Sequence, residues 1–191
     1  RIFVIGQCTL HWGRLEFGNI GNYYVLEPLF SNLRRSFPKS KIRTTFQLSD
    51  EFAKKHQLQV EPQELYYSWE GGALEVAEKE LALAEEYRKS GSLRESTSFI
   101  DVVLNSDLVV DYSGDIWGAN ADFLGEDRFR VGLVKDRVAQ LLGKSTALLA
   151  GSPGPFPKDG EIKFAQLTYS NFDLVTNREP HSTELLQKSG F

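Results

Sequence analysis

The chain has 191 residues, of which 41% are hydrophobic and 12% aromatic, so it can build a substantial core and a disordered protein is excluded. The formal net charge of -4 argues against a general nucleic-acid binder, which would carry a basic surplus. Cys8 is the single cysteine, which excludes a disulfide framework and a cysteine-based zinc site and favours a reducing compartment. No stretch approaches the roughly 20 apolar residues of a membrane-spanning helix.

Short apolar segments alternate with amphipathic ones along the whole chain. The expected strands are 2–5, 41–46, 108–110, 146–150 and 174–176. The expected helices are 22–37, 49–56, 70–90, 93–105, 127–142, 161–171 and 180–189. The segment 57–68 gives no clear pattern. This alternation predicts an α/β, doubly wound fold, in which a mostly parallel sheet is covered by helices on both faces.

The segment 70–90 gives the strongest helical pattern. Its apolar residues recur every three or four positions, at Leu74, Ala77, Leu81 and Ala84. The charges between them, with Glu78 and Glu80 among lysines, are interpreted as a solvated outer face.

Ligands of doubly wound folds bind beyond the carboxyl ends of the strands, so we expect the site residues in the loops at those ends. The first such loop, GQCTLHWGRLEFGNIGN, contains Gly18 and Gly21, which let the backbone approach a ligand, and leads into a helix N-terminus suited to an anion. Alternatively, Asn22 caps the helix and the glycines only make the turn. The loop matches neither the dinucleotide G-x-G-x-x-G pattern nor a phosphate loop.

The loop DYSGDIWGAN follows the strand 108–110. Asp111 and Asp115 stand around Ser113 and Gly114, and a carboxylate there could orient a sugar hydroxyl or act as general base. Alternatively, these aspartates bond their own backbone, as turn aspartates often do.

The loop GSPGPF follows the strand 146–150 and superficially matches a serine nucleophile elbow at Ser152. Such an elbow needs a backbone N–H on the next residue for the oxyanion hole, and Pro153 has none. The elbow is therefore excluded, and the loop is interpreted as a rigid Gly/Pro segment that lines a site.

The loop NREPHS follows the strand 174–176. Arg178 lies at the strand end and beside a helix N-terminus, where a guanidinium suits a two-pronged grip on carboxylate or phosphate. Alternatively, Arg178 forms a salt bridge with Glu179 or with a neighbouring helix. His181 is interpreted as a surface or capping residue.

The segments GNIGN, DLVVDYSGD, GSPGPF and VTNREPHS, in this order after successive strands, resemble the polysaccharide pyruvyl transferase family. The resemblance implies transfer of a pyruvyl group from phosphoenolpyruvate to hydroxyls of a sugar, in a surface polysaccharide or its lipid- or nucleotide-linked precursor. It implies neither cofactor nor metal, and a cytoplasmic protein or one at the inner face of the membrane. It also implies a two-lobed, glycosyltransferase-B-like architecture, of which residues 1–191 would be a single Rossmann-like N-terminal lobe without the C-terminal lobe.

The resemblance also assigns roles. Arg178 would bind phosphoenolpyruvate, and Asp115 would help to position the acceptor. Trp12 and Trp117 could stack on a sugar ring. The other substrate-binding residues expected are His11, Arg14, Gly18, Asn19, Gly21, Asn22, Ser113, Gly114 and Ser152.

Two positions depart from the family pattern and leave alternatives open. Asn22 stands where the family motif usually has an aspartate, and Ser113 precedes Gly114 where the family has paired glycines. The alternatives are a glycosyltransferase-B-type enzyme that uses a nucleotide sugar, and a non-catalytic sugar- or anion-binding relative. An NAD-dependent enzyme is disfavoured because the glycine fingerprint is missing.

Overall fold

A six-stranded parallel sheet forms the centre of the computed structural model, which describes the chain except for residues 7–19, 114–117, 155, 157 and 158. The strand order is β3-β2-β1-β4-β5-β6, the order of a doubly wound, Rossmann-like fold. The strands are β1 (Ile2–Ile5), β2 (Ile42–Thr44), β3 (Leu58–Val60), β4 (Leu108–Asp111), β5 (Ser145–Gly151) and β6 (Leu174–Asn177). The predicted fold class is confirmed, and β3 is a strand that the sequence pattern did not reveal.

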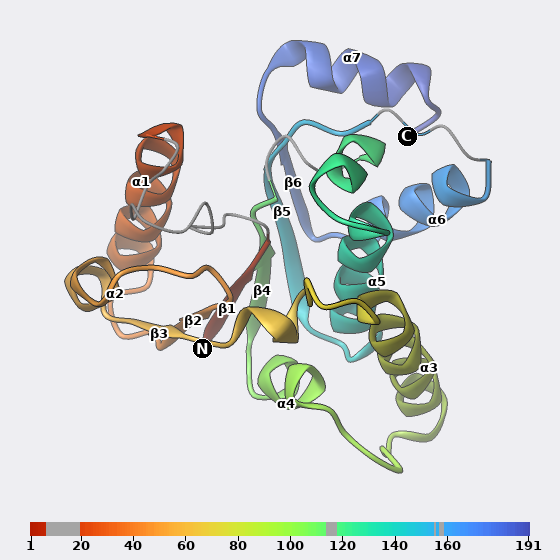
Figure 1. Cartoon of the computed structure of the whole chain (residues 1–191), viewed down its shortest axis with the longest axis horizontal. Helices are drawn as coiled ribbons and strands as arrows, with labels where there is room; N and C mark the ends of the chain where they lie inside the picture. Colours follow the sequence, from red (N-terminus) through yellow and green to blue (C-terminus); the bar gives the residue numbers. More distant parts are fainter. Residues whose placement is uncertain (7–19, 114–117, 155, 157–158) are drawn as a thin grey trace.

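Every predicted helix is present, with its ends shifted by up to a few residues. The α-helices are α1 (Ile20–Ser36), α2 (Asp50–His56), α3 (Ala73–Ser90), α4 (Ser98–Leu104), α5 (Arg128–Leu141), α6 (Asp159–Tyr169) and α7 (Pro180–Lys188). The 3-10 helices η1 (Gln63–Leu65) and η3 (Ala119–Leu124) lie in the connections. In Figure 1, α1 and α2 lie on one side of the sheet, and α3, α5 and α6 lie on the other.

Successive side chains of β1 point to opposite faces of the sheet and pack into two separate hydrophobic cores. Ile2 and Val4 pack with α1 and α2, whereas Phe3 and Ile5 pack with α3, α4 and α5. All four side chains are buried, as expected for the central strand of a parallel sheet covered on both faces.

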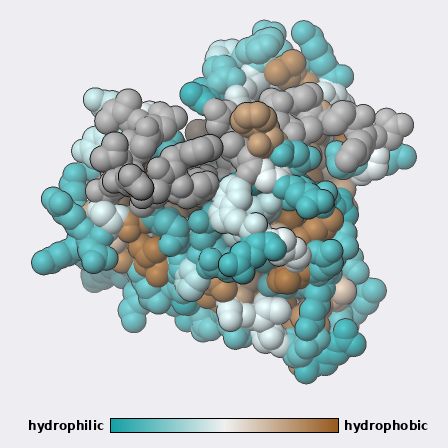
Figure 2. Space-filling view, viewed as in Figure 1, coloured by the Kyte–Doolittle hydropathy of each residue, from teal (hydrophilic) through white to brown (hydrophobic). Residues whose placement is uncertain are grey.

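The strand order also decides which part of the sheet stays uncovered. Right-handed crossovers place the helices that follow β1 and β2 on one face and those that follow β4 and β5 on the other. The α1 side of β5 and β6 therefore receives no crossover helix, and Leu174 of β6 is 52% exposed there. On the face shown in Figure 2, hydrophilic side chains cover most of the described surface and hydrophobic ones form separate groups between them.

Helix α5 packs against α3 through a buried ion pair, which corrects one expectation. Glu80 was expected on a solvated face, but it is 1% exposed, and its carboxylate lies 2.5 Å from the ammonium of Lys135. Lys135 also donates to the carbonyl of Leu65 and lies over the ring of Phe99, while Thr97 donates to Glu80. Burial lowers the pKa of Lys135, and the charge of Glu80 opposes that shift.

Candidate active site at the carboxyl edge of the sheet

The carboxyl ends of β1 and β4 meet directly, at the point where the strand order reverses. Gly6 follows β1 with φ +140°, and a Cβ there would lie 2.9 Å from the carbonyl carbon of Tyr112, which follows β4. Only glycine allows this approach without a shift of the backbone. Ligands of doubly wound folds bind at such a point, so this edge is the candidate site.

Many predicted site residues lie outside the residues that the structure describes. They are His11, Trp12, Arg14, Gly18, Asn19, Gly114, Asp115 and Trp117. Their predicted roles stay predictions.

Gly21 and Asn22 lie in the first turn of α1. The helix begins at Ile20, two residues before the predicted start, so Asn22 is a helical residue and the alternative in which it caps the helix is wrong. The first turn contains no acidic side chain, so no negative charge of that turn opposes an anion at the N-terminus of α1.

Ser113 and Asp111 turn inward. Asp111 is 1% exposed and Ser113 is 6% exposed, and the hydroxyl of Ser113 donates to Oδ1 of Asp111. Asp111 also bonds the side chain of Asp136 on α5, and Tyr66 bonds Ser113. Burial raises the pKa of Asp111. These groups connect the end of β4 to α5, and the predicted role of Ser113 in substrate binding stays a prediction.

The loops after β4 and β5 pack backbone against backbone. A Cβ at Gly118 would lie 2.3 Å from the carbonyl oxygen of Gly154, which itself has φ +94°. Just before this contact, β5 has an irregular register between Leu148 and Gly151, and Ala150 adopts φ 54°. A strained, bulged strand end beside a ligand edge is a common feature of functional sites. The Gly/Pro loop predicted to line a site therefore also holds the neighbouring loop in place.

The loops after β5 and β6 are joined by the residues of the R-E-x-x-S motif. The carboxylate of Glu179 accepts hydrogen bonds from Ser152, at 3.1 Å, and from Ser182, which is 1% exposed. The Ser182 bond is the main cause that lowers the pKa of Glu179. The backbone N–H of Arg178 donates to the carbonyl of Gly151, and the Arg178 side chain is exposed. The structure thus brings Ser152 and Arg178 to one corner of the edge.

A cluster that sequence reasoning missed lies where α5 begins, just after the loop that follows β4. Arg128 is 1% exposed, and its guanidinium lies 4.2 Å from the ring centre of Trp69 and 4.8 Å from that of Tyr67. The Tyr67 hydroxyl donates to the carbonyl of Glu126. No role was predicted for the segment 57–68 and the residues that follow it. Tyr67 and Trp69 of this part of the chain lie beside the carboxyl edge of the sheet.

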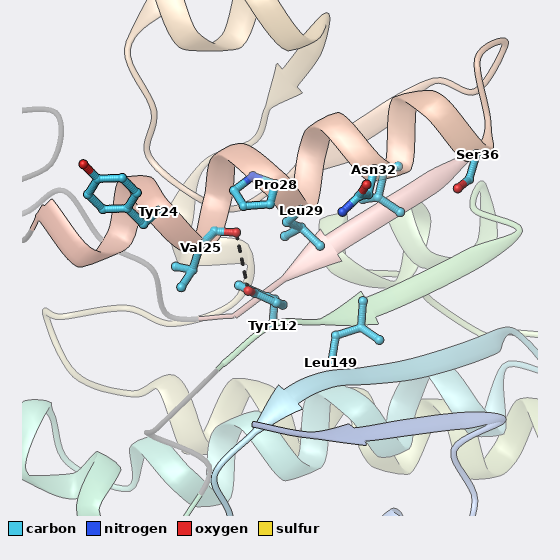
Figure 3. A pocket seen from close by; sticks show the side chains of 9 residues that line it. Tyr24, Val25, Pro28, Leu29, Asn32, Ser36, Tyr112 and Leu149 are labelled. Atoms are coloured by element: carbon cyan, nitrogen blue, oxygen red, sulfur yellow. Dashed lines mark hydrogen bonds between the residues drawn. The ribbon is translucent and has the colours of Figure 1, made fainter. Parts of the chain in front are cut away.

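A pocket of about 340 Å³ lies between α1 and the sheet and reaches the carboxyl edge at Tyr112 (Figure 3). Its lining side chains are uncharged: Tyr24, Val25, Pro28, Leu29, Asn32, Leu33, Ser36, Tyr112 and Leu149. The Tyr112 hydroxyl donates to the carbonyl of Val25 across it, at 3.4 Å. The pocket lies against the sheet face that no crossover helix covers. Its uncharged lining does not suit a multiply charged ligand.

Within the described residues, no group of three histidine, cysteine, aspartate or glutamate side chains is placed to hold a metal ion. No helix in the same part of the chain has the length and apolar character needed to cross a membrane.

The six-stranded parallel sheet and its crossover helices define a Rossmann-like α/β protein. The family model of polysaccharide pyruvyl transferase matches residues 19–191, and the chain belongs to this family. No curated protein and no solved structure shows a significant match to the chain. The family membership makes the protein a transferase of polysaccharide biosynthesis, with a sugar as the class of acceptor.

Proposed function

We propose that the protein transfers the pyruvyl group of phosphoenolpyruvate to two hydroxyls of one sugar, in a surface polysaccharide or its lipid- or nucleotide-linked precursor. The family membership supports the reaction class, and the exposed cation at the carboxyl edge supports an anionic donor. The protein acts in the cytoplasm or at the inner face of the membrane.

The reaction balances without an oxidant, a reductant or a further substrate. The bond between C2 of phosphoenolpyruvate and the phosphate oxygen breaks, and two bonds from C2 to sugar oxygens form. One hydroxyl proton converts the methylene carbon to a methyl group, and the other leaves on the phosphate. The products are a cyclic pyruvate ketal and inorganic phosphate. The protein's task is to hold a substrate with two anionic groups beside the acceptor hydroxyls.

The observation that carries this proposal is the difference between the contacts of Arg178 and those of Glu179 and Ser182. Glu179 and Ser182 bond each other and Ser152, so they hold the corner together. The backbone N–H of Arg178 bonds Gly151, and its side chain is exposed at the end of β6, where a cation suits an anionic ligand. Guanidinium matches the planar carboxylate and the phosphate of phosphoenolpyruvate.

Calorimetric titration of the chain with phosphoenolpyruvate tests the proposal. Arg178→Ala should weaken binding about 10- to 100-fold, the usual loss for a charge-assisted contact. Arg178→Lys keeps the charge without the planar fork and should fall in between. Arg88→Ala removes an exposed arginine on α3 and should bind as the wild type does.

UDP serves as the competing ligand in the same titrations. Saturable binding of phosphoenolpyruvate that depends on Arg178, with no binding of UDP, supports pyruvyl transfer. Binding of UDP that is indifferent to Arg178 would instead indicate a nucleotide-sugar glycosyltransferase, and the proposal would be abandoned.

A further inference from the structure

The cation of Arg128 is buried in an unfavourable place. Arg128 is the first residue of α5, where the helix dipole favours anions. Its guanidinium is nevertheless 1% exposed and lies over the rings of Tyr67 and Trp69. Burial lowers its pKa, although electrostatic interactions with Tyr66 and Tyr67 oppose that shift. These contacts connect the start of α5 to the segment that contains Tyr67 and Trp69.

The result of this cluster is a rigid indole. Arg128 supports one side of Trp69, and Tyr67 meets it edge-on, with 5.1 Å between ring centres. A Cβ at Gly125 would lie 3.2 Å from the indole and 2.4 Å from the Tyr67 hydroxyl, so the loop after β4 is pressed against the pair. Despite these contacts, Trp69 is 43% exposed. The protein thus fixes a large apolar ring and leaves much of it in water.

The loop that presses on Trp69 exposes a second aromatic ring. Phe123, two residues before Gly125, is 91% exposed. Exposed aromatic rings that gather in one region of the surface are typical of binding sites. Since this loop follows β4, both rings belong to the carboxyl edge of the sheet, where a ligand of this fold binds.

We propose that Trp69 is a stacking surface for a sugar ring of the acceptor, with Phe123 beside the same chain of sugars. This inference rests on the proposed function for the identity of the acceptor. A pyranose has one face of C–H groups that packs on an aromatic plane, and its hydroxyls stay hydrated at the rim. An indole already held by Arg128 and Tyr67 loses little conformational freedom on binding, which favours weak, repeated contacts with a polysaccharide.

Saturation-transfer NMR with methyl β-D-galactopyranoside and methyl β-D-glucopyranoside tests the inference. In the wild type, transfer should concentrate on the ring C–H protons of at least one probe. Trp69→Ala should weaken its binding about 5- to 10-fold, as loss of a stacking ring does. Trp69→Tyr should restore most of it, because a flat ring returns. Trp69→Leu covers Arg128 without a flat ring and should resemble Trp69→Ala.

Phe37→Ala is the matched control. Phe37 is 47% exposed but follows α1 at the opposite, amino-terminal edge of the sheet, so its loss should change nothing. Titration of each variant with phosphoenolpyruvate separates the two proposals, because Trp69→Ala should bind the donor normally. The inference would be overturned by equal saturation transfer in the wild type and Trp69→Ala, by no transfer in the wild type, or by binding of Trp69→Tyr as weak as that of Trp69→Ala. Any of these results would favour a protein, and not a sugar, as the partner of Trp69.

Discussion

The carboxyl groups of Asp111 and Asp136 form a buried pair whose titration should be measurable in the stability of the protein. Each residue is 1% exposed, and their side chains bond each other. Two carboxyl groups can bond each other only when one of them holds a proton. Asp111→Asn places a permanent donor beside Asp136 and keeps an oxygen for the hydroxyl of Ser113. The variant therefore keeps both contacts and removes the titration of Asp111.

The sign and the slope follow from proton binding. Burial raises the pKa of Asp111 in the folded protein, whereas the unfolded chain titrates near its usual value of about 3.9. Below that value both states hold the proton, and the contribution of Asp111 to stability is complete. As pH rises, only the folded state keeps the proton, so this group lowers the free energy of unfolding by about 1.4 kcal/mol per pH unit until it titrates in the folded state. Asp111→Asn should therefore gain on the wild type as pH rises from about 4, and the difference should then level off.

Urea unfolding of both proteins between about pH 4 and pH 7 measures this difference. Asp107→Asn is the matched control, because it removes the same charge from an exposed residue just before the same strand. The hydrogen bond from Arg1 lowers the pKa of Asp107 to about 2, so its variant should differ from the wild type by a constant amount. A difference between Asp111→Asn and the wild type that is also independent of pH, or that shrinks as pH rises, would contradict a raised pKa of Asp111 in the folded protein.

Three further variants test the packing around the site. Lys135→Ala leaves Glu80 buried without its cation and should cost about 3–5 kcal/mol in urea unfolding, whereas the combined change of both residues to apolar ones should cost much less. Gly118→Ala drives a Cβ into the backbone of Gly154 and should lower stability by about 1–3 kcal/mol, and an unchanged unfolding midpoint would show that the loops move apart freely. Glu179→Ala should weaken phosphoenolpyruvate binding a few-fold in calorimetry, whereas Glu179→Gln, which keeps an acceptor, should not.

Most of the fold could be predicted because its signals are local. Strands buried on both faces are short apolar runs, and helix ends carry turn residues, so the alternation of elements was clear. The strand Leu58–Val60 was missed because it is a three-residue edge strand with an exposed Gln59 and pairs only with β2. The predicted helix 93–105 begins only at Ser98, because Thr97 caps it with a bond from the N–H of Ile100.

The candidate site could be predicted only in part, because its contacts join distant segments. The orientation of Asp111 was available from the sequence: it alternates with Val110 and shares a face with Val109, which is core. The contacts of Arg128 with Trp69 had no such signal, because no spacing along the chain indicates that these residues meet. The same holds for Glu80, which has the sequence context of a solvated helix face and meets its cation only in the folded protein.

Most polar groups and glycines of the post-strand loops serve contacts between the loops, and fewer are placed to contact a ligand. The glycines at 118 and 154 let two loops pack at backbone distance, and Ser152 and Glu179 join the second of these loops to a third. Residues that such contacts already hold lose little freedom when a ligand binds, which favours binding through a small number of side chains. On this reasoning, the residues of the edge divide into a rigid frame and a small set of ligand contacts. We expect Arg178 to belong to the contacts because its side chain is exposed at the end of β6, whereas Glu179 and Ser182 bond each other.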